Sequence, residues 1–120
     1  MNCLAVAVAG SAGAVARYGL VRWLEPWSAS FPWSIFAVNV AGCLLFGLAW
    51  GAGSQRWPEV VQVAILAGFF GAFTTFSSFA FDCSVLIDQG RYVAAAGNVI
   101  GQNVLGVLAM IGGIAAGRLL

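Results

Sequence analysis

Residues 71–79 read Gly-Ala-Phe-Thr-Thr-Phe-Ser-Ser-Phe and lie in the middle of an apolar stretch that runs from about Glu59 to Ile87. One glycine and four hydroxyl side chains within these nine residues disfavour a continuous helix, because hydroxyl groups offer the backbone alternative hydrogen-bond partners. Within a bilayer, non-helical backbone is tolerated only where it is buried in protein or lines a polar cavity. The stretch therefore predicts a long helix that is broken near its middle, with freed carbonyl groups facing something polar.

The composition of the whole chain is that of a membrane protein. Of 120 residues, 62% are hydrophobic, five are basic, four are acidic, and none is lysine or histidine. The surface of a soluble domain carries roughly 25–35% charged residues, so lipid is the natural solvent for this chain. A spanning helix needs about 20 mainly apolar residues. Four such helices fit, and we predict one all-α membrane domain over residues 1–120 with helices at about 2–24, 33–53, 59–87 and 92–117.

Local signals agree with these boundaries. Pro26 ends the first helix, since a proline disfavours helical geometry in the residue before it. Pro58 and Glu59 suit the start of the third helix. The apolar N-terminal stretch lacks the positive region of a signal peptide and exceeds the usual length of its apolar core, so we interpret it as a retained first helix.

Small residues and cysteines suggest packing rather than chemistry. Three glycine pairs four residues apart predict close helix contacts, since small residues let helices approach in lipid. The pairs are Gly47–Gly51, Gly97–Gly101 and Gly113–Gly117. Cys3, Cys43 and Cys83 are far apart in apolar surroundings, and without histidine they form no ordinary zinc motif. We interpret all three as small buried hydrophobic residues.

The arginines are balanced between the two sides of the membrane. With four spans, Arg56 and Arg118 share one side, while Arg22 and Arg91 share the other, with Arg17 nearby. The positive-inside rule needs an excess of positive charge on one side to fix an orientation. We therefore predict that the chain inserts both ways and that two copies pair antiparallel, as in the inverted repeats of larger transporters.

Polar groups inside a membrane are expensive and mark candidate functional residues. The candidates are Asn39, Thr74, Thr75, Ser77, Ser78, Asn98, Gln102 and Asn103. The alternative is that they only link helices, which is worth about 0.6 kcal/mol for each hydrogen bond. Because the first, second and fourth helices have no acidic residue in their cores, the interior offers N–H and O–H donors, which suit an anion.

Three phenylalanines recur at a spacing of three residues, namely Phe73, Phe76 and Phe79. The edge of an aromatic ring is positive and can face an anion, although ordinary aromatic packing gives the same spacing. No pair of carboxylates and no serine beside a base stands out, so we do not expect an enzyme. No basic cluster suggests nucleic acid as a partner.

Three motifs in chain order are similar to those of the Fluc (CrcB) family of fluoride channels. Residues 10–18 resemble the signature of its first helix, residues 39–42 match its second-helix Asn-x-x-Gly, and residues 68–79 match its third-helix motif. The third motif departs only mildly from that of the family. Ala72 stands where a second glycine is usual, and Ser78 fills a position that takes threonine or serine in the family. In the fourth helix, Gln102 aligns with a hydroxyl residue of the family, and Asn98 lies one turn earlier.

The resemblance implies an antiparallel homodimer in the bacterial inner membrane, with two pores for passive efflux of cytoplasmic fluoride. It assigns Asn39, Phe76, Phe79, Ser77 and Gln102 to the pore. It assigns the backbone carbonyls of Gly71 and Thr74, from both subunits, to a central structural sodium ion, and Arg17 to a vestibule or to the structure.

Three alternatives stay open from the sequence. A small multidrug exporter shares this length and dual topology, but it needs a membrane-embedded acid, usually in the first helix, where this chain has none. A purely structural subunit would have no evident use for the hydroxyl cluster. One half of a heterodimeric fluoride channel would need a separately encoded partner.

Overall fold

The computed structural model describes residues 2–53 and 55–120, which are helical apart from short connections. α1 (Asn2–Leu24) is extended by a 3-10 turn, η1 (Glu25–Trp27), and is followed by α2 (Trp33–Gly53). The third spanning segment consists of α3 (Glu59–Val63), a π-helix η2 (Ala64–Phe70), α4 (Gly71–Phe73) and α5 (Phe76–Asp88); α6 (Tyr92–Gly117) is the last helix. Four segments are long and apolar enough to cross a membrane, which confirms the predicted fold class of four spans with a broken third helix.

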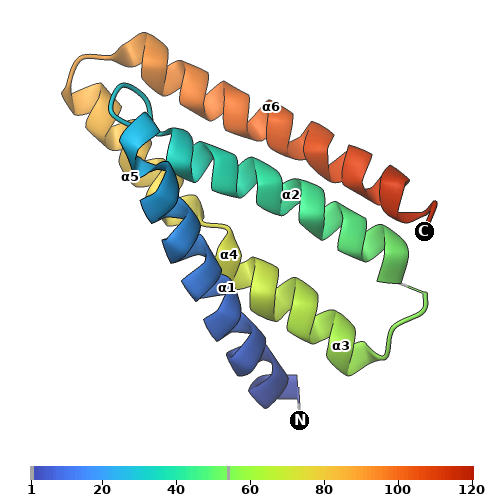
Figure 1. The fold of residues 1–120 in the computed structure, drawn as a ribbon. Coiled ribbons are helices and arrows are strands. Elements are labelled where there is room, and N and C mark those ends of the chain that lie inside the picture. Colours follow the sequence, from blue (N-terminus) through green and yellow to red (C-terminus); the bar gives the residue numbers. More distant parts are fainter. Residues whose placement is uncertain (1, 54) are drawn as a thin grey trace.

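The helices pack in pairs that alternate along the chain. α2 lies along α6, whereas α1 lies against the first half of the third span (Figure 1). After the break, α5 leads toward the end of the molecule where α1 finishes and α6 begins (Figure 1). The break therefore lies near the middle of the molecule, where α1, α2 and α6 can all reach it.

Glycines bring the backbones of α2 and α6 together. A Cβ atom added to Gly113 would lie 2.2 Å from the Leu44 carbonyl oxygen, and one added to Gly47 would lie 2.3 Å from that of Met110. Gly51 and Gly117 are equally close to the facing helix, at 2.5 and 2.3 Å. Two of the predicted glycine pairs are thereby confirmed. The third is wrong for Gly97, where an added Cβ would meet nothing within 4 Å because Gly97 lies on an exposed face of α6. At Gly101 an added Cβ would lie 2.9 Å from the Phe36 ring of α2.

A pair of neighbouring glycines tests this packing directly. We expect Gly113→Ala to destabilise the bundle by about 1–3 kcal/mol or more, because overpacking forces the two backbones apart. Gly112→Ala is the matched control, since a Cβ there meets nothing within 4 Å and alanine favours the helix by about 1 kcal/mol. Unfolding in SDS titrations should separate the two variants, and equal stability would contradict the close contact.

The backbone of α1 approaches the π-helix in a similar way. A Cβ added to Gly13 would lie 2.1 Å from the Phe69 carbonyl oxygen, and one added to Gly68 would lie 2.9 Å from the Cβ of Ala9. Close to this contact there is a buried apolar cluster between α2 and the third span, formed by Val38, Phe70 and Phe73. The first half of the third span is thus anchored by backbone contact on one side and side-chain packing on the other.

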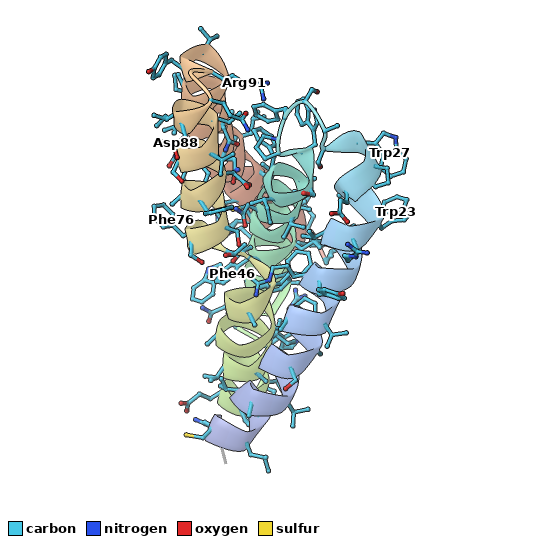
Figure 2. All side chains as sticks on the ribbon, turned by 90° about the vertical axis from the view of Figure 1, so that its left-hand side faces the viewer. Trp23, Trp27, Phe46, Phe76, Asp88 and Arg91 are labelled. Carbon is cyan, nitrogen blue, oxygen red and sulfur yellow. The ribbon has the colours of Figure 1, made fainter. Side chains whose placement is uncertain are left out.

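Several charged and aromatic side chains lie at the end of the molecule where α1 finishes and α6 begins. Figure 2 shows Trp23, Trp27, Asp88 and Arg91 toward the same end, with Phe76 and Phe46 nearer the middle. Arg22 and Glu25 form an exposed ion pair at 2.7 Å beside the two tryptophans. Tryptophan rings at such a level are typical of a membrane–water interface.

The interpretation of the cysteines holds only in part. Cys83 is buried and Cys43 is half-buried, but Cys3 is exposed. The interpretation is therefore wrong for Cys3, because it lies in the first turn of α1 beyond the packed part of the bundle.

Candidate functional site

Thr74 and Thr75 break the third span by adopting extended backbone geometry, with φ/ψ of −84°/156° and −149°/115°. The last helical bond before the break runs from Thr74 N–H to the Phe70 carbonyl oxygen at 3.1 Å. In a continuous helix the next N–H, that of Thr75, would donate to the Gly71 carbonyl. Here it donates to Asn39 Oδ1 at 2.8 Å.

A similar exchange of hydrogen-bond partners occurs on the other side of the break. Ser78 N–H would donate to the Thr74 carbonyl in a continuous helix, but it donates to the hydroxyl oxygen of Thr75 at 3.3 Å, which caps the start of α5. The carbonyls of Gly71 and Thr74 therefore lack helical partners. The C-terminal carbonyls of α4 are partially negative and the N-terminal N–H groups of α5 are partially positive. The break can therefore bind a cation through its carbonyls and an anion through its N–H groups.

Asn39 holds the break from α2. Its Nδ2 donates to the Thr75 carbonyl oxygen at 3.0 Å and to Gln102 Oε1 at 2.8 Å, while its Oδ1 accepts from Thr75 N–H. The side chain thus satisfies both backbone groups of one residue in the break and links them to α6. Both protons of its amide are used within the protein.

The polar chain continues through α6 to α5. Gln102 Nε2 donates to Asn98 Oδ1 at 2.9 Å, and Asn98 Nδ2 donates to Cys83 Sγ at 3.3 Å. Asn98 is fully buried. The Thr75 hydroxyl lies 3.1–3.2 Å from the hydroxyls of Ser78 and Ser77.

Most of the predicted pore residues surround one cavity. Its volume is about 230 Å³, and it is lined by Asn39, Cys43, Thr74, Thr75, Phe76, Phe79, Gln102 and Asn103. No acidic or basic side chain is among these lining residues. The structure therefore brings together residues from α2, the helix break and α6 that the sequence only suggested one by one.

The two predicted pore phenylalanines have different environments. Their ring centroids lie 5.4 Å apart with a tilt of 57°. Phe79 is 8% exposed and packs with Ile35 and Cys83, whereas Phe76 is 79% exposed on the outer side of α5 (Figure 2). Phe73, which shares their spacing, lies in the apolar cluster with Val38 and Phe70, so ordinary packing explains it.

Other predicted residues lie outside the cavity. Ser77 and Gly71 are exposed near the break and are absent from the cavity lining. Arg17 is half-buried on α1, and within the described part of the chain it forms no ion pair or hydrogen bond. The chain of amides from Asn39 to Asn98 was not foreseen, because nothing in the spacing along two separate helices reveals which side chains meet.

Comparisons with known proteins give the family of the chain. A family model described as CrcB-like protein, Camphor Resistance (CrcB), matches residues 4–114. A protein of Solidesulfovibrio magneticus named fluoride-specific ion channel FluC is 43% identical, with 96% of this chain and 94% of the relative covered. One of the same name from Maridesulfovibrio salexigens is 41% identical, covering 98% and 95%.

A third relative extends the match. A protein of Symbiobacterium thermophilum named fluoride-specific ion channel FluC 1 is 44% identical, with 98% of both chains covered. All three relatives are bacterial, and together with the four apolar helices they identify an integral membrane protein. Because the family model and these relatives cover almost all of its length, the chain belongs to the CrcB-like protein family.

Proposed function

We propose that this protein is a fluoride-selective channel that lets fluoride leave the cytoplasm passively across the bacterial inner membrane. The observation that carries the proposal is the cavity at the helix break, which is lined by amides, hydroxyls and two phenylalanines and by no charged side chain. The relatives named fluoride-specific ion channels support the choice of ion.

An uncharged, donor-bearing path suits a small anion. Stripping water from an ion costs tens of kcal/mol in the Born limit, so the path must replace the lost water contacts. Positive ring edges of Phe76 and Phe79, the N–H groups at the start of α5 and amide protons of the cavity supply such contacts. Because no charged side chain lines the cavity, the ion meets no fixed charge there that would bind it too tightly to leave.

The proposed path needs a second copy of the chain. Phe76 is 79% exposed and Gly71 is also exposed, so one side of the site is open in a single chain. The balanced arginines at the two ends favour an antiparallel homodimer, in which each copy closes the site of the other and two pores result. A separately encoded partner would serve the same purpose in a heterodimer.

The freed carbonyls fit a structural sodium ion. Unwound carbonyls and the C-terminal ends of half helices are typical sodium ligands in membrane transporters. Gly71 and Thr74 have lost their helical donors to Asn39 and to the Thr75 hydroxyl, and Gly71 lies on the open side of the site. We propose that these carbonyls, contributed by both copies, hold sodium and so fix the two broken helices together.

The multidrug-exporter alternative finds less support in this geometry. Its coupling acid would have to be Asp82, since α1 carries no acidic residue. Asp82 lies in a separate cavity of about 220 Å³ near the end of α5, where Arg91 and Gln89 also lie. It is not among the residues that line the cavity at the break.

The decisive experiment is efflux from liposomes that contain the purified protein, followed with a fluoride electrode and repeated with chloride. We expect fast fluoride efflux without any coupling ion gradient, and little chloride efflux. Replacing sodium by a large organic cation on both sides should abolish activity if sodium is structural. Equal fluoride and chloride rates, or no fluoride efflux from an intact dimer in sodium, would refute the proposal.

A further inference from the structure

The direction of the hydrogen bonds through the amide chain follows from one backbone residue. Thr75 N–H can only donate, so the atom of Asn39 that faces it must be Oδ1. The Thr75 carbonyl can only accept, so it must face Asn39 Nδ2. Two independent backbone groups therefore fix the orientation of the Asn39 amide without ambiguity.

This orientation then passes along the chain. Since Nδ2 of Asn39 also faces Gln102, the atom it meets must be Oε1, and Nε2 of Gln102 must face Asn98. The atom of Asn98 that accepts from it must in turn be Oδ1, which leaves Nδ2 to donate to the Cys83 thiol. Three amides thus share one direction, from the helix break to Cys83 on α5.

Counting protons along this chain shows which amide can serve an ion. Both Nδ2 protons of Asn39 are donated within the protein, to Thr75 and Gln102. Nε2 of Gln102 has two protons, and Asn98 is its one acceptor among the described residues. Gln102 also lines the cavity at the break, whereas Asn98 does not. Among the three amides of this hydrogen-bonded chain, the one with a spare donor beside the path is therefore that of Gln102. Asn103 also lines the cavity, but it stands outside this chain and its amide is bonded to the Val99 carbonyl of its own helix.

We propose that Gln102 donates its second Nε2 proton to the permeating anion and that Asn98 is the positioning residue that holds this amide in place. Asn39 holds Gln102 by its oxygen and Asn98 holds it by its nitrogen, so the side chain is fixed at both ends. Asn98 is itself fixed by full burial and by its bond to Cys83. This assignment rests on the proposed anion channel and names the donor within it.

A double-mutant cycle in fluoride efflux separates positioning from a merely structural role. Losing a hydrogen bond that orients a donor should cost roughly tenfold in rate, so we expect Asn98→Leu to slow fluoride efflux by about that factor. Gln102→Leu should slow it at least as much. In the Gln102→Leu background, Asn98→Leu should have no further effect, because it acts through Gln102. Multiplicative losses in the double variant would overturn the positioning role.

A second readout does not depend on transport. The chain has four glutamines, Gln55, Gln62, Gln89 and Gln102, so glutamine labelled with 15N at its side chain gives few NMR signals. The Gln102 pair is the one lost in Gln102→Leu. We expect Asn98→Leu to shift this pair alone and fluoride to shift it in the unmodified protein.

The two readouts distinguish the possible failures. An unchanged Gln102 pair in Asn98→Leu would refute the positioning role whatever the transport result. A fluoride response confined to other residues would refute the donor role of Gln102. A chain that transports no fluoride but shows the Asn98-dependent shift would refute the proposed function and leave the positioning contact standing.

Discussion

Replacing Phe76 or Phe79 by isoleucine is expected to lower fluoride efflux by about ten- to a hundredfold while the protein still folds. Each substitution removes a positive ring edge from the cavity at the break and replaces it with an alkyl group that cannot stabilise an anion. Hydrogen bonds to a charged group are worth about 1.5–3 kcal/mol. We expect the loss of a ring edge that faces the ion to cost a similar amount, which corresponds to that range of rates. Fluoride efflux from liposomes, normalised to the amount of folded protein, measures the effect.

The structure supplies a control and separates the two variants. Phe81→Ile changes an exposed ring on the same half helix, 67% exposed and outside the cavity, and should conduct normally. Phe79→Ile should also lose up to about 1.5 kcal/mol of stability, because Phe79 is buried beside Ile35. Phe76→Ile should leave the stability of a single chain nearly unchanged, because the Phe76 ring is exposed. Normal flux in both site variants would refute the ring-edge interpretation.

Asn39→Leu should have the second large effect, and it should act on folding as well as on transport. The substitution leaves Thr75 N–H and the Thr75 carbonyl without their partners in a buried part of the bundle. Each buried group left unpaired costs about 1–3 kcal/mol. We expect unfolding at a clearly lower SDS fraction and no measurable fluoride efflux.

Asn103→Leu is the matched control for stability. Asn103 is exposed on α6, and its amide donates only to the Val99 carbonyl of its own helix, at 2.7 Å. This variant should unfold at nearly the SDS fraction of the unmodified protein. If Asn39→Leu and Asn103→Leu unfolded together, Asn39 would not be holding the break.

The fold was largely predictable because its signals are local. Apolar length, the prolines at positions 26 and 58, and the hydroxyl cluster at residues 74–78 place the helices and their break without reference to any other part of the chain. The π-helix at Ala64–Phe70 was not predicted, since the choice between α and π turns depends on contacts such as that of Gly13 with the Phe69 carbonyl. The exposure of Cys3 was missed for a related reason, because an apolar neighbourhood in sequence does not mean burial when the solvent is lipid.

The candidate site was predictable as a set of residues but not as a set of bonds. Motif similarity and polar character selected Asn39, Phe76, Phe79 and Gln102, and the structure places them around one cavity. Which protons remain available could not be derived from the sequence, because that depends on pairings between α2, the break and α6. The fluoride and sodium assignments rest on the proposed function.

The alternating arrangement of the helix pairs has a consequence for synthesis. α2 packs along α6 and α1 packs along the third span, so neither of the first two helices finds its partner in the next helix to leave the ribosome. Individual helices are stable in lipid before they associate, so the spans can insert one at a time and remain unpaired until their partner helix has inserted. The glycine surface of α2 and the amide of Asn39 stay without α6 until the last helix has entered the membrane. A chain stalled before α6 would therefore carry every predicted motif of the first three spans and still have no assembled site.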